Sequence, residues 1–253
     1  MHFDSFSAGL ALDRGETAAC RIMPWDRAAA EATLCGALRS FVVLVLALDT
    51  ATPTLVAGLA RWSADGVEVL AERAVPSGNR HAELLTPAVQ GVLVDAGLGL
   101  ADVAAVVTGL GPGPFTGLRV GVVTAAALAD ARGLPVIGVC SLDAIGSGAR
   151  TVVTDARRKE IYWAGYDADG VRTDGPEVVR PEEAQLTGPF VGNPAFESRL
   201  GASVTPAEVT TAGLLRAATP QLADPSSAAP LVPLYLRRPD ATPPTAIKAV
   251  SRA

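Results

Sequence analysis

The fold is decided by the stretch from Val106 to Val139, VVTGLGPGPFTGLRVGVVTAAALADARGLPVIGV. An apolar run at 103–108 predicts a strand, and the glycines and prolines after it predict a tight turn. A small-residue helical pattern begins near Thr116 and ends at Gly133, where a glycine commonly closes a helix. A second apolar run at 136–139 predicts another strand. Strand, turn, helix and strand in this order indicate a parallel α/β unit.

The glycine-rich turn of this stretch suits an anion, because backbone N–H groups there lie at a helix N-terminus. It is not a Walker A loop, since Gly117 is followed by Leu118 and Arg119 and not by Lys and Ser or Thr. It is also not placed as a Rossmann fingerprint, which follows the first strand of its unit. The turn alone leaves two interpretations open: contact with a phosphate, or a tight turn that packs a helix on a sheet.

Composition narrows the class of protein. The chain has 253 residues, 49% of them hydrophobic, which is enough for one large or two small globular domains. No apolar run approaches the roughly 20 residues of a membrane span. The net charge is −5 and the one basic cluster is Arg157–Lys159, so the chain is a poor candidate to bind nucleic acid by itself. Three widely spaced cysteines fit a reducing cytoplasm and no zinc-binding spacing.

The two ends of the chain differ from its middle. Residues 1–41 include an alanine-rich segment that could form one helix, but it has only a thin apolar face. We expect an extension outside the fold, with a regulatory helix as the alternative. Residues 241–253 are expected to be a C-terminal tail.

An internal repeat organises the rest of the chain. Residues 42–75 are predicted to form a strand that ends in Asp49, a second strand, an Asp-Gly hairpin and a third strand. Residues 151–179 repeat this order, with a first strand that ends in Asp155. Helices are predicted at 81–97, 116–132 and 207–218, and further strands at 190–192 and 234–236. We therefore expect two α/β lobes, 42–149 and 150–240, of which the second is reduced.

Duplicated lobes whose first strand ends in Asp resemble the actin, Hsp70 and sugar-kinase superfamily, with its RNase H-like fold. Within it, the chain resembles the TsaB (YeaZ) family over roughly residues 43–240. The motifs that carry this resemblance occur in the order of that family: ALDTATPTLVAGL (47–59), RHAELLTPAV (80–89), GLGPGPFTGLRVGV (109–122), TDARRKEIYWAGY (154–166) and PLYLR (233–237).

This resemblance implies a role in the bacterial modification of tRNA to threonylcarbamoyladenosine. It implies a non-catalytic dimerisation subunit, a catalytic partner similar to TsaD, and an ATPase similar to TsaE that joins through the complex. It also implies contact with tRNA only through the partner, and a homodimer when the partner is missing.

The resemblance also suggests a vestigial nucleotide site, with weak ATP or ADP binding at most and no other cofactor. Its expected residues are Asp49, Thr50, Gly111, Gly113, Thr116 and Gly117. A capped hairpin is the competing interpretation of Asp49 and Thr50, since Asp and Thr close turns. No metal is expected, because His81 has Leu85 and not a second histidine four residues later. Asp155-Ala156 also replaces the glycines of a phosphate turn in TsaD.

Two other functions share this fold class or its history. An ATP-dependent small-molecule kinase would need an intact second phosphate turn and an acid or base in the cleft. A peptidase would need a pair of histidines or an activated nucleophile, and the two histidines of the chain stand far apart, at positions 2 and 81.

The expected partner surface lies on the helices at 81–97 and 116–132. Small residues four apart on the second helix would let another helix approach closely, whereas the competing interpretation is that they pack on their own sheet. The predicted interface consists of Leu84, Leu85, Gly117, Leu118, Gly121, Val122, Ala125 and Ala129.

Overall fold

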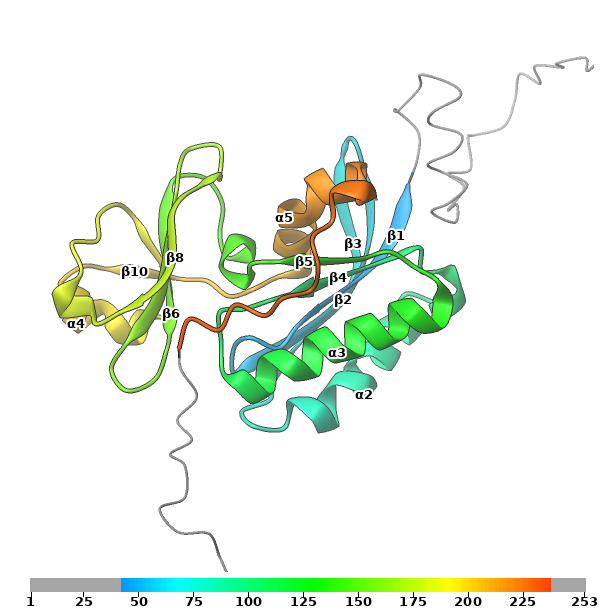
Figure 1. Ribbon diagram of the computed structural model, residues 1–253, viewed down its shortest axis with the longest axis horizontal. Helices are drawn as coiled ribbons and strands as arrows, with labels where there is room; N and C mark the ends of the chain where they lie inside the picture. The colour runs from blue at the N-terminus through cyan, green and yellow to red at the C-terminus, as the bar shows by residue number, and fades with distance from the viewer. Residues whose placement is uncertain (1–41, 238–253) are drawn as a thin grey trace, which may run out of the picture.

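The computed structural model describes residues 42–237, which form two five-stranded sheets joined by a short connection (Figure 1). The predictions for residues 1–41 and 241–253 lie outside the described residues. None of the helices within residues 42–237 could span a membrane.

The first sheet has the strand order β3-β2-β1-β4-β5. Strands β1, β2 and β3 form an antiparallel meander, and β4 and β5 extend it in parallel beside β1. The meander follows from the Asp65-Gly66 turn, and the parallel part follows from the helix that links β4 to β5. The bounds are β1 Val43–Asp49, β2 Thr54–Ser63, β3 Gly66–Pro76, β4 Ala105–Gly109 and β5 Val136–Val139.

Helices cover both faces of this sheet. Helices α2 (His81–Asp95) and α3 (Phe115–Arg132) lie on one face, and α5 (Thr211–Ala223) lies on the other (Figure 1). Alternate residues of β1 supply the two cores, because successive side chains of a strand point to opposite faces. Leu46 packs in the cluster with α2 and α3, and Val45 packs in the cluster with α5.

The second sheet has the order β10-β9-β6-β7-β8, which repeats the topology of the first with each strand in the corresponding place. Its single described α-helix between β9 and β10, α4 (Glu197–Leu200), is one turn long, so this lobe is reduced as predicted. The duplicated actin-like fold expected from the sequence is therefore confirmed. The bounds are β6 Arg150–Asp155, β7 Ile161–Tyr166, β8 Arg172–Val179, β9 Phe190–Gly192 and β10 Val204–Pro206.

Two segments differ from the sequence prediction. The helix expected at 207–218 begins at Thr211, because the Thr210 hydroxyl accepts a hydrogen bond from the N–H of Gly213 and so caps it. It belongs to residues 150–240 by chain order, yet it packs on the first sheet. The strand expected at 234–236 is wrong, since the segment pairs with none of the described strands, and Leu234 N donates to the carbonyl of Leu110, the residue after β4. The predicted division between residues 149 and 150 stays a prediction.

Candidate functional site

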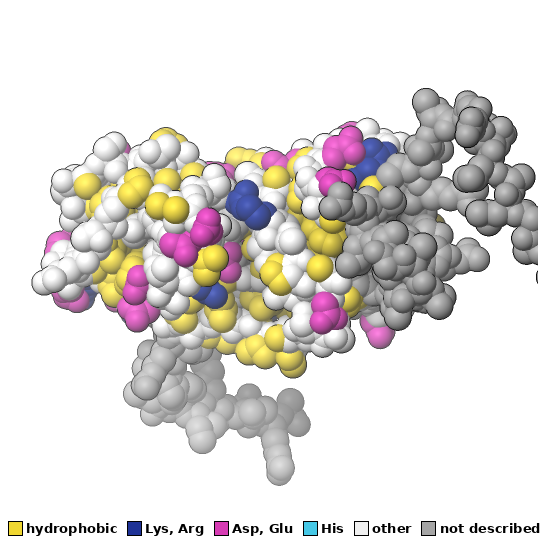
Figure 2. All heavy atoms as spheres, turned by 90° about the horizontal axis from the view of Figure 1, so that it is seen from above, with side chains coloured by type: hydrophobic (Ala, Val, Ile, Leu, Met, Phe, Trp, Pro, Cys, Tyr) yellow, Lys and Arg dark blue, Asp and Glu magenta, His cyan; other side chains and the backbone are white. Residues whose placement is uncertain are grey.

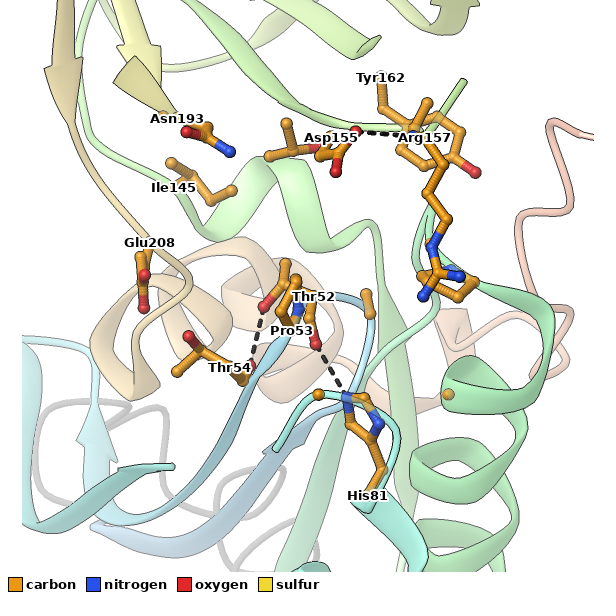
Figure 3. Close-up of a pocket in the computed structure, with 18 of the residues that line it drawn as sticks. Thr52, Pro53, Thr54, His81, Ile145, Asp155, Arg157, Tyr162, Asn193 and Glu208 are labelled. Carbon is orange, nitrogen blue, oxygen red and sulfur yellow. Dashed lines mark hydrogen bonds between the residues drawn. The ribbon is translucent and has the colours of Figure 1, made fainter. Parts of the chain in front are cut away.

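A cavity of about 830 Å³ opens between the two lobes. The first lobe lines it with the β1–β2 turn, the start of α2 and the start of α3, and the second lobe lines it with the β6–β7 loop and the ends of β9 and β10. Figure 3 shows Thr52 and His81 on one side, and Asp155 and Arg157 on the other. The C-terminal segment closes part of its edge with Tyr235 and Arg237.

Asp49 does not face this cavity. Its side chain is fully buried, where its carboxylate accepts hydrogen bonds from the Ser141 hydroxyl at 2.5 Å and from the backbone N–H of Ala51 at 2.8 Å. Burial raises the pKa of Asp49 to about 6, and the bonds from Ser141 and Ala51 lower it in part. Asp49 is therefore not among the residues that line the cavity, and its contact with a nucleotide stays a prediction. The carboxylate instead joins β1 to the segment that leads into the second lobe.

Thr50 is also buried, and its side chain holds α3 against the β1–β2 turn. Its hydroxyl donates to the carbonyl of Gly117 at 2.7 Å and accepts from the N–H of Gly121 at 3.0 Å. A Cβ built on Gly121 would lie 2.4 Å from this hydroxyl oxygen, closer than atoms can pack. The β1–β2 turn therefore occupies the groove that the two glycines open. Thr50 likewise does not line the cavity, and its contact with a nucleotide stays a prediction.

Part of the glycine-rich turn before α3 lines the cavity. Gly113, Thr116 and Gly117 line it. Gly111 lies apart, with its N–H bonded to the Ser141 hydroxyl at 3.1 Å and with a left-handed φ of 91° that favours glycine. A Cβ on Gly113 would lie 2.2 Å from the carbonyl oxygen of Ala51. Close packing of the turn on the β1–β2 loop thus explains this glycine without a ligand.

His81 lines the cavity as a structural residue. Its Nε2 lies 2.9 Å from the carbonyl oxygen of Thr52, which ties the start of α2 to the β1–β2 turn. Leu85, four residues on, is buried in the core. In the part of the chain that the structure describes, no three His, Cys, Asp or Glu side chains gather closely enough to hold a metal ion.

The second lobe presents a charged loop to the cavity. Asp155 ends β6, and its carboxylate accepts from the backbone N–H of Arg157 at 2.7 Å. Arg157, Arg158 and Lys159 follow with left-handed φ values of 63°, 51° and 68°, which is uncommon for residues with side chains. The carboxylates of Asp155 and Glu208 also line the cavity. Arg157 and Arg237 line it as well, so the second lobe presents both signs of charge to the cavity.

Sequence reasoning missed an aromatic cluster at the cavity edge. The rings of Phe115 and Tyr235 lie 4.9 Å apart, and the guanidinium of Arg119 lies 3.7 Å from the centre of the Phe115 ring. Arg119 also donates to the Tyr235 hydroxyl at 3.1 Å. Tyr235 lies 116 residues after Arg119, and the PLYLR motif was the one signal that pointed to the C-terminal segment.

The residues of α3 that were predicted to form a partner interface are not exposed, so this part of the prediction is wrong. All six are buried: Gly117, Leu118, Gly121, Val122, Ala125 and Ala129. The two glycines lie against Thr50, and the two alanines pack in the core beside the first sheet. On α2, Leu85 is buried and Leu84 half-buried. Other apolar residues of the two helices are exposed, among them Val94 with 76% of its surface exposed and Val123 with 64%. The same helices thus offer a different face.

Comparisons with known proteins agree with this architecture. A family model described as "TsaD: tRNA N6-adenosine threonylcarbamoyltransferase" matches residues 74–224. The tRNA threonylcarbamoyladenosine biosynthesis protein TsaB of Escherichia coli is 36% identical over 164 residues, 58% of this chain and 69% of that protein. An uncharacterized protein of Mycobacterium tuberculosis is 50% identical over 206 residues, 79% of this chain and 94% of the relative. The solved structure of YeaZ from Pseudomonas aeruginosa superposes with a TM-score of 0.62 at 26% identity, and the match covers 77% of this chain and all of that one.

Proposed function

Because the chain belongs to the TsaB (YeaZ) family, we propose that it is the non-catalytic dimerisation subunit of a tRNA threonylcarbamoyladenosine synthase. The relatives named TsaB support a role in this tRNA modification. The finer assignment, a cytoplasmic scaffold for a TsaD-like catalytic subunit, rests chiefly on one observation. The Asp that ends the first strand is buried and fully engaged by Ser141 and Ala51.

This observation weakens a catalytic role for the cavity. A carboxylate that orients phosphates must reach them, but the side chain of Asp49 has no exposed surface. His81 is the one histidine among the lining residues, and its Nε2 already lies within hydrogen-bonding distance of the carbonyl of Thr52. A single imidazole is too few ligands for a metal site, which needs several. Weak binding of ATP or ADP along Gly113–Gly117 stays within the proposal, without turnover.

The outer face of α2 and α3 supports the scaffold role. Val94 and Val123 are large apolar side chains that water surrounds in the free chain. Leu84, Leu93, Val120 and Leu128 are half-buried residues of the same two helices. Exposed apolar side chains on two neighbouring helices are a suitable contact for a matching helix pair. We propose that it binds the TsaD-like subunit in the complex, that a second copy covers it when that subunit is absent, and that a TsaE-like ATPase joins the assembled pair.

The test is assembly followed by modification. The chain and the TsaD-like protein of the same cell are co-expressed and analysed by light scattering, and modification of a tRNA transcript is measured with the remaining components. We expect a heterodimer, a homodimer of the chain alone, and no modification when the chain is omitted. Full modification without the chain, or two proteins that never associate, would refute the proposal.

A further inference from the structure

We propose that the rim of the interlobe cavity binds an unpaired stretch of RNA, with basic side chains on its phosphates and aromatic rings on a base. The inference rests on the proposed function, because it takes the RNA to be the tRNA that the complex modifies. It departs from the expectation that this chain reaches tRNA only through its partner.

The first part of the rim is an aromatic cluster at the start of α3. Phe115 and Tyr235 are 37% and 41% exposed, although large rings are usually buried. The Arg119 guanidinium is held over the Phe115 ring and bonded to the Tyr235 hydroxyl. These contacts fix three planar groups beside one another at the surface. Such planar groups are what unpaired bases stack on.

The C-terminal segment joins this cluster to the second lobe. Figure 1 shows the segment, in orange-red, running from α5 across to that lobe. Two residues after Tyr235, Arg237 donates from Nη1 to the carbonyl of Ala156 at 2.8 Å and lies 3.5 Å from the Glu160 carboxylate. The aromatic cluster and the β6–β7 loop are therefore held as parts of one surface across the cavity mouth.

The β6–β7 loop is the second part of the rim. Arg157, Arg158 and Lys159 are exposed, and each has a left-handed φ although it carries a Cβ. Backbone strain of this kind persists where the surrounding structure imposes it, and it is common at ligand sites. The loop is closed by bonds from Ala156 N to the carbonyl of Glu160 and from Glu160 N to that of Arg157. Its side chains are thus displayed from a defined backbone.

The charge of the chain limits how tightly the rim alone can bind RNA. The chain has a net charge of −5, and Figure 2 shows basic side chains as isolated groups among acidic and apolar ones on the face in view. Glu160 offsets part of the charge of Arg237 at 3.5 Å. Binding by the free chain should therefore be weak, and the rim should act beside the tRNA surface of the partner. An acidic peptide would pair with the arginines but would gain nothing from the stacked rings, which favours RNA.

The test measures binding of an unmodified tRNA transcript, with adenosine next to its anticodon, to the complex with the TsaD-like subunit. Filter binding over a range of salt concentrations gives the dissociation constant and its salt slope. The double variant Arg157→Glu with Lys159→Glu should bind about tenfold more weakly, with a slope reduced by about 2. Tyr235→Ala should also weaken binding by about tenfold, whereas Tyr235→Phe should keep it, because the ring and not the hydroxyl stacks.

Arg180→Glu is the matched control, since Arg180 is exposed in the same lobe, lies 3.7 Å from Glu183 and does not line the cavity. It should bind as the parent does. Melting temperatures and assembly are measured for every variant, and Arg157→Gln with Lys159→Gln replaces any double variant that fails to fold. Rim variants that assemble and bind tRNA like the parent at every salt concentration would overturn the inference alone. If the parent does not assemble, the proposed function fails. Photocrosslinking of the free chain to the same transcript at low salt then tests RNA binding by the rim: adducts at Tyr235 would support the inference, and their absence would overturn it.

Discussion

The hydroxyl of Thr50 lies 3.0 Å from the backbone nitrogen of Gly121, so a side chain of the β1–β2 turn fills the groove on α3. The same hydroxyl donates to Gly117, one turn earlier on the helix. The small residues of α3 are therefore used within the subunit, where they let the helix lie close on its own turn. Surfaces for partners must be sought on the opposite side of the helix.

The first prediction concerns this contact. Gly121→Ala should lower the free energy of unfolding by about 1–3 kcal/mol, because the added methyl group would overlap the Thr50 hydroxyl. The intrinsic helix preference of alanine, about 1 kcal/mol, opposes this effect only in part. Urea denaturation measures the difference. The control is Ala127→Gly on the exposed side of α3, which should lose about 1 kcal/mol through helix propensity alone. A Gly121→Ala protein more stable than the parent would contradict the packing described.

The second prediction concerns pH and Asp49. Its pKa in the folded chain is about 6, above the ordinary value of 3.8, so the folded state holds this proton more tightly than the unfolded state. The contribution of Asp49 to stability is therefore present below pH 4 and is lost as the pH rises to about 6. The loss is on the order of 3 kcal/mol.

Asp49→Asn removes this titration and keeps an oxygen that can accept from Ala51. Relative to the parent, the variant should gain stability as the pH rises from 4 to 7, as measured by urea denaturation at several pH values. A stability difference that stays constant over this range would mean that the carboxylate is not held in the buried, raised-pKa state.

The third prediction concerns the exposed face of α3. Val123→Arg should prevent both the homodimer and the complex with the TsaD-like subunit, because it places a charge in an apolar contact, while the melting temperature changes little. Val171→Arg, at a valine of the second lobe that is 62% exposed, is the control and should leave assembly unchanged. Light scattering and pull-down read both assemblies. Two intact assemblies in the Val123→Arg protein would place the interface elsewhere.

The fourth prediction concerns ATP. The purified chain should release phosphate from ATP no faster than buffer, since the Asp49 carboxylate is bonded to Ser141 and does not reach the cavity. A coupled phosphate-release assay with and without the chain measures this. Turnover that disappears in the Asp49→Asn variant would favour the alternative, a small-molecule kinase of the same fold.

Much of the fold is encoded in short patterns. The alternation and turns of β1, β2 and β3 and their repetition in β6, β7 and β8 are local, and Gly133 ends α3 with a left-handed φ of 60°, as glycine allows. These patterns also carry the family, because its motifs are contiguous blocks. The duplication and the reduced second lobe followed from them.

The site depended on contacts that no local pattern contains. Whether Asp49 faces a ligand or its own core was decided by Ser141, 92 residues away, and the buried side of α3 was decided by Thr50. The rim joins Arg119 to Tyr235, 116 residues apart. The sequence by itself determined which elements form and in what order, because hydrogen bonding and hydrophobic periodicity act over a few residues. Only the tertiary structure decided which face of each element is buried and which side chains meet, because these depend on how distant segments fill the same space.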